Sequence, residues 1–118
     1  MTALAWALLA ALHALPALAL VRPSLLTTLY RVEPGTTAFM LLHHRAALFG
    51  VVVLLCLWAL VDPGIRRAAS VAVAVSMISF IALWWGHGAP APLRTIAIAD
   101  LVGLVPLAWV VWTAFRGV

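Results

Sequence analysis

Three ionisable side chains, His43, His44 and Arg45, lie together inside a long apolar run. A charged side chain in the hydrocarbon of a bilayer is costly and usually faces a bundle interior, a partner or a ligand. Arginine donates hydrogen bonds in a planar fork that suits carboxylates and phosphates, whereas histidine can ligate a metal or carry a proton. The stretch therefore marks the inside of the structure and its candidate binding chemistry.

Two further ionisable residues, His13 and Asp100, interrupt other apolar runs. At about 1.5 Å per helical residue, His13, His43 to Arg45 and Asp100 all lie about 8 to 12 Å below the end of the helices that carries the longer loops. His87 falls in a loop above this depth. We expect one polar layer from three helices, with these ligand-binding candidates: His13, His43, His44, Arg45, His87 and Asp100.

The layer permits a structural and a functional interpretation. The structural one is an ion pair between Arg45 and Asp100, because pairing recovers much of the cost of burying each charge. In the functional one, Arg45 is the bidentate donor to a bound quinone head group, carboxylate or lipid phosphate. A weaker alternative is a metal or haem held by His13 with His43 or His44, to which His87 and Asp100 could add ligands. No cofactor is identified by these residues alone.

The composition is that of a membrane protein. Of 118 residues, 67% are hydrophobic and 8% are charged, which leaves too few polar residues to cover a soluble globule. Seven arginines and no lysine supply the basic excess, and they lie near the ends of the apolar runs, so a nucleic-acid-binding patch is not indicated. Only Cys56 carries a thiol, which excludes an intrachain disulfide.

Four apolar segments have about the length that a helix needs to cross a bilayer core. We predict a single all-α transmembrane domain over residues 1–118, an up-down-up-down four-helix bundle. A short stretch at residues 62–64 is typical of a tight hairpin turn, whereas residues 22–36 form either an ordinary loop or a short interfacial helix. The first segment is interpreted as a span and not as a signal peptide, because no basic residue precedes it. The predicted helices cover about residues 3–21, 37–61, 68–85 and 95–115.

Four spans place both termini and the Asp62 turn on one side, the closed side, and the two longer loops on the other, the loop side. Tryptophans near both ends fit two interfacial belts, with Trp6, Trp58, Trp109 and Trp112 on the closed side and Trp84, Trp85 and Tyr30 on the loop side. The arginine distribution slightly favours a cytoplasmic closed side in a bacterial inner membrane. Small residues at four-residue spacing predict close helix contacts: Ala68, Ala72 and Ser76; Ala46 and Gly50; Ala99 and Gly103.

Several features together resemble the pattern of small uncharacterised four-helix bacterial membrane proteins that are loosely DoxX-like. These features are His13, a polar loop with Tyr30 and the Glu33-Pro34 step, the run from Leu42 to Gly50, and Asp100. The resemblance implies an inner-membrane bundle in which His13, His44, Arg45 and Asp100 match the polar positions, and an association with redox and sulfur metabolism. Some such proteins carry the name phosphopantetheine adenylyltransferase. That activity is not expected here, because this sequence has no phosphate-cradling glycine loop.

Two functions follow as hypotheses. The first is binding of a small ligand or cofactor, quinone-like, lipid or metal, in the polar layer. The second is an accessory subunit of a larger membrane complex or a homo-oligomer, in which the Arg45 and Asp100 pair is structural. An enzyme is less expected, because Ser76, Ser79 and Cys56 have no evident base at their depth.

Overall fold

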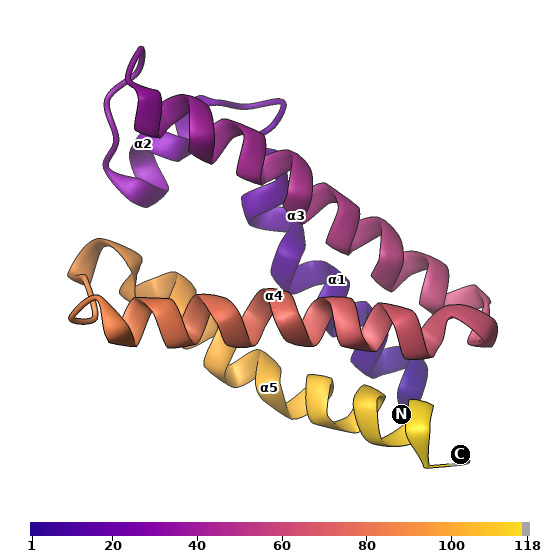
Figure 1. Cartoon of the computed structure of the whole chain (residues 1–118). Coiled ribbons are helices and arrows are strands. Elements are labelled where there is room, and N and C mark those ends of the chain that lie inside the picture. The colour runs from indigo at the N-terminus through magenta and orange to yellow at the C-terminus, as the bar shows by residue number, and fades with distance from the viewer. Residues whose placement is uncertain (117–118) are drawn as a thin grey trace.

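The computed structural model describes residues 1–116, and in these residues every regular element is helical (Figure 1). The ends of the three longer helices lie within two residues of the predicted boundaries. The first helix ends earlier than predicted, because residues 19–21 continue it only as tighter turns with hydrogen bonds to the third residue before. The helices are α1 (Thr2–Leu18), α2 (Ser24–Tyr30), α3 (Thr37–Val61), α4 (Arg66–Gly86) and α5 (Arg94–Phe115), with 3₁₀ turns η1 (Pro63–Ile65) and η2 (Ala91–Leu93).

Three of these segments are long and apolar enough to cross a membrane: α3, α4 with its preceding turn, and α5 with its preceding turn. The α1 helix is equally apolar but has 17 residues, near the lower limit for a span. Their outward side chains include many leucine, valine, isoleucine and tryptophan residues, which are compatible with contact to lipid. The chain is thus all-helical and of the membrane-protein class.

Local signals in the sequence explain where these helices begin and turn. The Thr36 hydroxyl accepts a hydrogen bond from the Phe39 amide at 3.1 Å and so caps the start of α3. At the hairpin, the Asp62 carboxylate accepts from the Gly64 amide at 2.8 Å, and Pro63 opens the η1 turn. Arg66 then donates from Nε to the Ala59 carbonyl at 2.7 Å, which satisfies an acceptor at the end of α3.

The segment before α3 was expected to be either an ordinary loop or a short interfacial helix, and it has features of both. Residues 24–30 do form a short helix, α2, but its Leu26 and Tyr30 are buried against Ala19 and Ala46 at the loop side of the bundle. Arg31 ends α2 in the left-handed conformation, with a φ of 56°. The short helix therefore packs on the other helices, and it covers the loop-side ends of α1 and α3.

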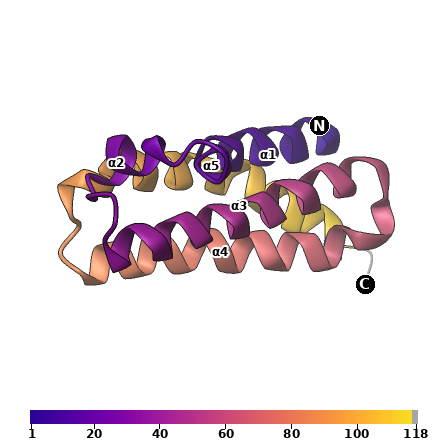
Figure 2. The same ribbon diagram turned by 90° about the horizontal axis from the view of Figure 1, so that it is seen from above.

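The four long helices are not equally close to one another. The α1 helix packs along α3 and α5, and α4 packs along α5, whereas α3 and α4 have the sparsest contact of these neighbouring pairs. Figure 1 shows α3 and α4 joined at the η1 turn and separating toward the loop side. Figure 2 shows the α3–α4 turn at the same end of the molecule as the start of α1 and the end of α5.

The core is continuous near the closed side, where α1, α3, α4 and α5 all contribute. Trp6, which was predicted to join an interfacial belt, is instead fully buried there, because α1 lies between α3 and α5. Tyr30 is likewise buried, while Trp58, Trp85 and Trp112 are exposed. The principal core residues besides Trp6 are Leu9, Val52, Cys56, Ala69, Val73, Met77, Leu107 and Val110.

The predicted small-residue contacts are realised in part. Gly103 is buried, and a Cβ added there would lie 2.6 Å from Leu12 Cδ1 and 2.7 Å from Met77 Cε, so α1, α4 and α5 meet closely at this point. A Cβ added to Gly50 would meet nothing within 4 Å. Ala68 is exposed, so the predicted stripe on α4 does not begin at a helix contact.

These two glycines make a matched pair for a stability test. We expect Gly50→Ala to raise the free energy of unfolding by roughly 0.5 to 1 kcal/mol, because alanine favours the helix and has room there. Gly103→Ala should instead lower it by about 1 kcal/mol, since Leu12 and Met77 must move. Unfolding in mild detergent, followed by helical circular dichroism, measures both. Equal stabilisation by the two substitutions would contradict the close contact at Gly103.

Candidate functional site

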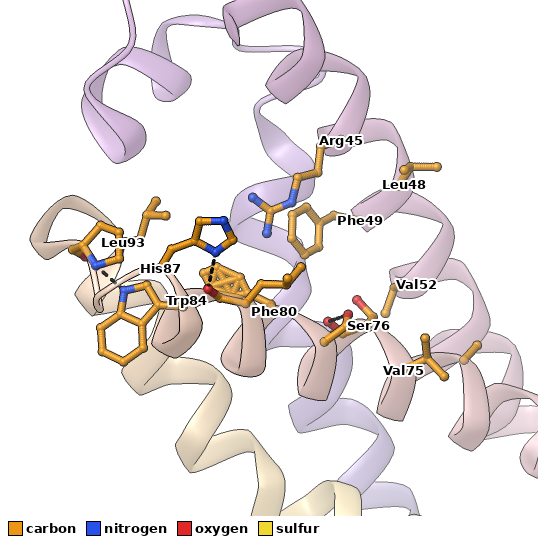
Figure 3. Close-up of a pocket in the computed structure, with 14 residues that line it drawn as sticks. Arg45, Leu48, Phe49, Val52, Val75, Ser76, Phe80, Trp84, His87 and Leu93 are labelled. Carbon is orange, nitrogen blue, oxygen red and sulfur yellow. Dashed lines mark hydrogen bonds between the residues drawn. The ribbon is translucent and has the colours of Figure 1, made fainter.

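The separation of α3 from α4 leaves a groove of about 700 Å³ between them. That volume is within the usual range for small-molecule sites. Most of its walls are apolar or aromatic, and its polar side chains are Arg45, Ser76, Ser79, Trp84 and His87. Figure 3 shows Arg45 and Phe49 from α3 facing the side chains of α4 across this space. The other lining residues are Leu48, Val52, Ala72, Val75, Phe80, Leu83, Pro90 and Leu93.

The Arg45 guanidinium lies among aromatic rings. Its central carbon is 4.9 Å from the ring centre of Phe49, 5.0 Å from that of Phe80 and 5.8 Å from that of Tyr30. Each distance is within the range of a cation–π interaction, which holds the cation while leaving its N–H groups free to donate. The rings come from α3, α4 and α2, so three segments position one guanidinium.

The direct ion pair expected between Arg45 and Asp100 is not formed within residues 1–116, where no carboxylate lies within 4.0 Å of an arginine nitrogen. Asp100 is half-buried on α5 and does not line the groove. Both charges nevertheless act on Tyr30: burial raises the pKa of its hydroxyl, Arg45 lowers it and Asp100 raises it. The three side chains thus share one electrostatic neighbourhood, with Arg45 alone facing the groove.

His87 and Trp84 close the loop side of the groove. The Trp84 indole donates to the Pro90 carbonyl at 3.0 Å, which ties the end of α4 to the following loop. His87 donates from Nδ1 to the Leu83 carbonyl at 2.8 Å, so in the neutral ring Nε2 is left as an acceptor (Figure 3). The loop histidine that the sequence placed above the layer therefore lies at the mouth of the groove.

The other predicted histidines do not line the groove. His13 is buried, donates from Nδ1 to the Leu9 carbonyl at 2.8 Å, and has its ring centre 5.9 Å from that of Phe49. His43 donates from Nε2 to the Leu20 carbonyl at 2.9 Å and so joins α3 to the chain after α1. His44 is exposed, about 100° around α3 from its neighbour. Of the six candidates, Arg45 and His87 meet at one site.

The metal alternative has no support in the part of the chain that the structure describes. No three histidine, cysteine, aspartate or glutamate side chains there come close enough together to hold a metal ion. The histidines considered as metal ligands do not converge. His13 and His43 turn toward the backbone carbonyls of Leu9 and Leu20, while His44 turns outward. Equal depth along the helices did not bring the side chains to one centre.

The aromatic and serine walls were not predicted as site residues, although the sequence holds a signal for them. Ala72, Ser76, Phe80 and Trp84 recur every four residues along α4, and Val75, Ser79 and Leu83 follow the same spacing beside them. In the first row, the small side chains of Ala72 and Ser76 leave space beside α4, and the rings of Phe80 and Trp84 bound that space toward the loop side. The sequence alone could not tell whether such a row faces another helix, a groove or lipid.

Comparison with known protein families, with curated proteins and with solved structures gives no match to this chain. The resemblance to DoxX-like proteins thus stays a prediction.

The adjacent histidines give a direct test of these placements. We expect His43→Ala to lower the free energy of unfolding by about 1 kcal/mol, because it removes the hydrogen bond to Leu20. His44→Ala should change it by less than about 0.5 kcal/mol, since that side chain is exposed. Thermal unfolding in detergent measures both effects, and hydrogen exchange should increase near Leu20 in His43→Ala only. A larger effect of His44→Ala would contradict the assignment.

Proposed function

We propose that this protein binds an amphipathic, quinone-like molecule in the groove between α3 and α4. In this proposal α1, α3, α4 and α5 form an up-down-up-down transmembrane bundle in a bacterial inner membrane, with both termini on the cytoplasmic side. The observation that carries the proposal is the Arg45 guanidinium, which faces an apolar groove with no carboxylate partner in residues 1–116. A half-buried cation whose N–H groups have no carboxylate of these residues within 4.0 Å can donate to an acceptor from elsewhere.

The shape of the groove supports a ligand with a head and a tail. Its lining on α4 runs from Ala72 to Trp84, about 18 Å along the helix axis. The polar side chains Arg45 and His87 lie toward the loop side, whereas Val52, Ala72 and Val75 make the other end apolar. A polar head at Arg45 with an apolar tail toward Val75 satisfies both ends.

The chemistry around Arg45 favours a flat head group with acceptor oxygens. The guanidinium can donate to a carbonyl oxygen, and Phe49, Phe80 and Trp84 offer ring faces on which a planar head can stack. The Ser76 and Ser79 hydroxyls add polar atoms to the α4 wall of the groove. A lipid phosphate could use the same arginine but would gain nothing from the flat faces, so the quinone-like head is the better fit.

Access from the bilayer follows from the rim of the groove. Leu48, Val75 and Leu83 line it and are 53%, 63% and 61% exposed. In a membrane such side chains would contact lipid, so a membrane-soluble molecule could enter sideways between α3 and α4. No passage through water is then needed for the tail.

Native mass spectrometry of the protein, released in mild detergent from its host membranes, tests the proposal. We expect a small adduct with the mass of a quinone that is retained by the wild type and by Arg22→Gln. Arg45→Gln should weaken retention about 10- to 100-fold, the cost of a hydrogen bond to a charged donor. Arg22 is the control because it is an exposed arginine outside the groove.

Other masses would overturn this assignment. A phospholipid adduct lost in Arg45→Gln would replace the quinone by a lipid phosphate. A larger assembly of unlike chains without any adduct would support the accessory-subunit alternative, in which the exposed apolar faces are docking surfaces.

The direction of the tail can be tested separately. Ala72→Leu should narrow the apolar end of the groove, so a long-tailed quinone loses affinity about tenfold while a short-tailed one is unaffected. Ala68→Leu is the control, because Ala68 lies one turn earlier on α4, is exposed and does not line the groove. Binding of both quinones is measured by quenching of tryptophan fluorescence. Equal loss for the two quinones in Ala72→Leu would contradict the proposed tail position.

A further inference from the structure

The closed side holds a second concavity, of about 460 Å³, beyond the apolar end of the groove. Three arginines line it, Arg66, Arg67 and Arg116, together with the hydroxyl residues Thr2 and Thr113. None of its lining residues is acidic. The nearest acidic residue along the chain is Asp62, whose Oδ1 accepts a hydrogen bond from the Gly64 amide at 2.8 Å. The lining of the concavity therefore carries three positive charges, with the Asp62 carboxylate bonded to the lining residue Gly64.

Contacts with the backbone hold two of the arginines in place. Arg66 donates to the Ala59 carbonyl at 2.7 Å and the Leu60 carbonyl at 3.3 Å, and Arg67 donates from Nε to the Ala114 carbonyl at 3.1 Å. Each guanidinium has five N–H groups, so both retain several free donors. These bonds join the ends of α3 and α5 to the start of α4. They also fix the orientation of the two guanidinium groups before any ligand binds.

The third arginine and a threonine complete the donor set. The central carbon of Arg116 is 4.9 Å from the ring centre of Trp112, and no carboxylate in residues 1–116 lies within 4.0 Å of its nitrogens. The Thr2 hydroxyl accepts from the Trp109 indole at 3.3 Å, which leaves its own proton to donate. Four donor side chains thus surround one space, and their N–H and O–H groups suit the oxygens of an anion such as a phosphate.

The neighbouring tryptophans indicate where that anion comes from. Trp58, Trp109 and Trp112 are 55%, 37% and 55% exposed at the same end of the bundle. Exposed tryptophans collect at the level of lipid head groups, so the arginines lie at the depth of the phosphates and beside the acyl chains. Basic pockets between transmembrane helices on the cytoplasmic side are suited to such head groups.

We infer that the concavity lined by Arg66, Arg67 and Arg116 binds the phosphodiester head group of an anionic phospholipid. The arginines and the Thr2 hydroxyl donate hydrogen bonds to the phosphate oxygens. The acyl chains lie along the outer surface near Trp112. This site is separate from the groove, and its occupation does not depend on the quinone-like ligand.

Native mass spectrometry of the purified chain in mild detergent, titrated with phosphatidylglycerol or phosphatidylcholine, tests the inference. We expect preferential binding of a phosphatidylglycerol molecule. Each arginine removed should weaken it about fivefold, so Arg67→Gln with Arg116→Gln should weaken it about 25-fold. Arg94→Gln is the control for a single substitution. It removes one positive charge from an exposed arginine on the loop side and should leave the affinity unchanged.

Three results would overturn the inference: equal binding of phosphatidylcholine, equal loss in Arg94→Gln, or displacement of the lipid by an equal concentration of inorganic phosphate. The last result would assign the site to a free anion. If the double variant loses its helical circular dichroism, Arg116→Gln alone is decisive, because the Arg116 guanidinium lies over the Trp112 ring, whereas that of Arg67 is hydrogen-bonded to the end of α5. Arg116→Lys keeps the charge and should restore most of the binding.

Discussion

The close packing of α1 against both α3 and α5 is the constraint on which the rest of the structure depends. At Gly103, α5 comes near enough to α1 and α4 that a single added carbon would clash with Leu12 and Met77. The α4 helix is thereby held to α5, whereas α3 is held to α1. Because each of the two helices follows a different partner, α3 and α4 separate beyond their shared turn, and the groove is the space that this separation leaves (Figure 1).

Hydrogen bonding then decides which polar side chains remain available to a ligand. His13 and His43 each donate to a backbone carbonyl of the α1 segment, and an apolar environment makes such bonds hard to give up. Arg45 instead rests on ring faces, which satisfy its charge only partly and occupy none of its N–H donors. The same polar layer therefore contains His13, bonded within α1, His43, which joins α3 to the chain after α1, and Arg45, whose donors stay open.

The two ends of the molecule carry their positive charge differently. At the closed side, three arginines surround a concavity and two of them are bonded to helix ends, so the charge is concentrated and fixed. Toward the loop side, one arginine faces a long apolar groove. We propose that the first arrangement takes a lipid head group and the second a membrane-soluble ligand, and the two sites share no lining residue.

The sequence by itself determined the membrane class and the long helices, because a helix long enough to cross a bilayer needs a run of apolar residues that is visible without any tertiary contact. It also singled out Arg45 and His87, since isolated polar residues in or beside such runs are conspicuous. Depth along an axis can be counted from the sequence, but rotation about it cannot, so His44 was grouped with residues from which it points away. Only the packing of α1, α3, α4 and α5 decided that Trp6 is core, that Arg45 meets aromatic rings instead of Asp100, and that the serine and aromatic row of α4 lines a groove.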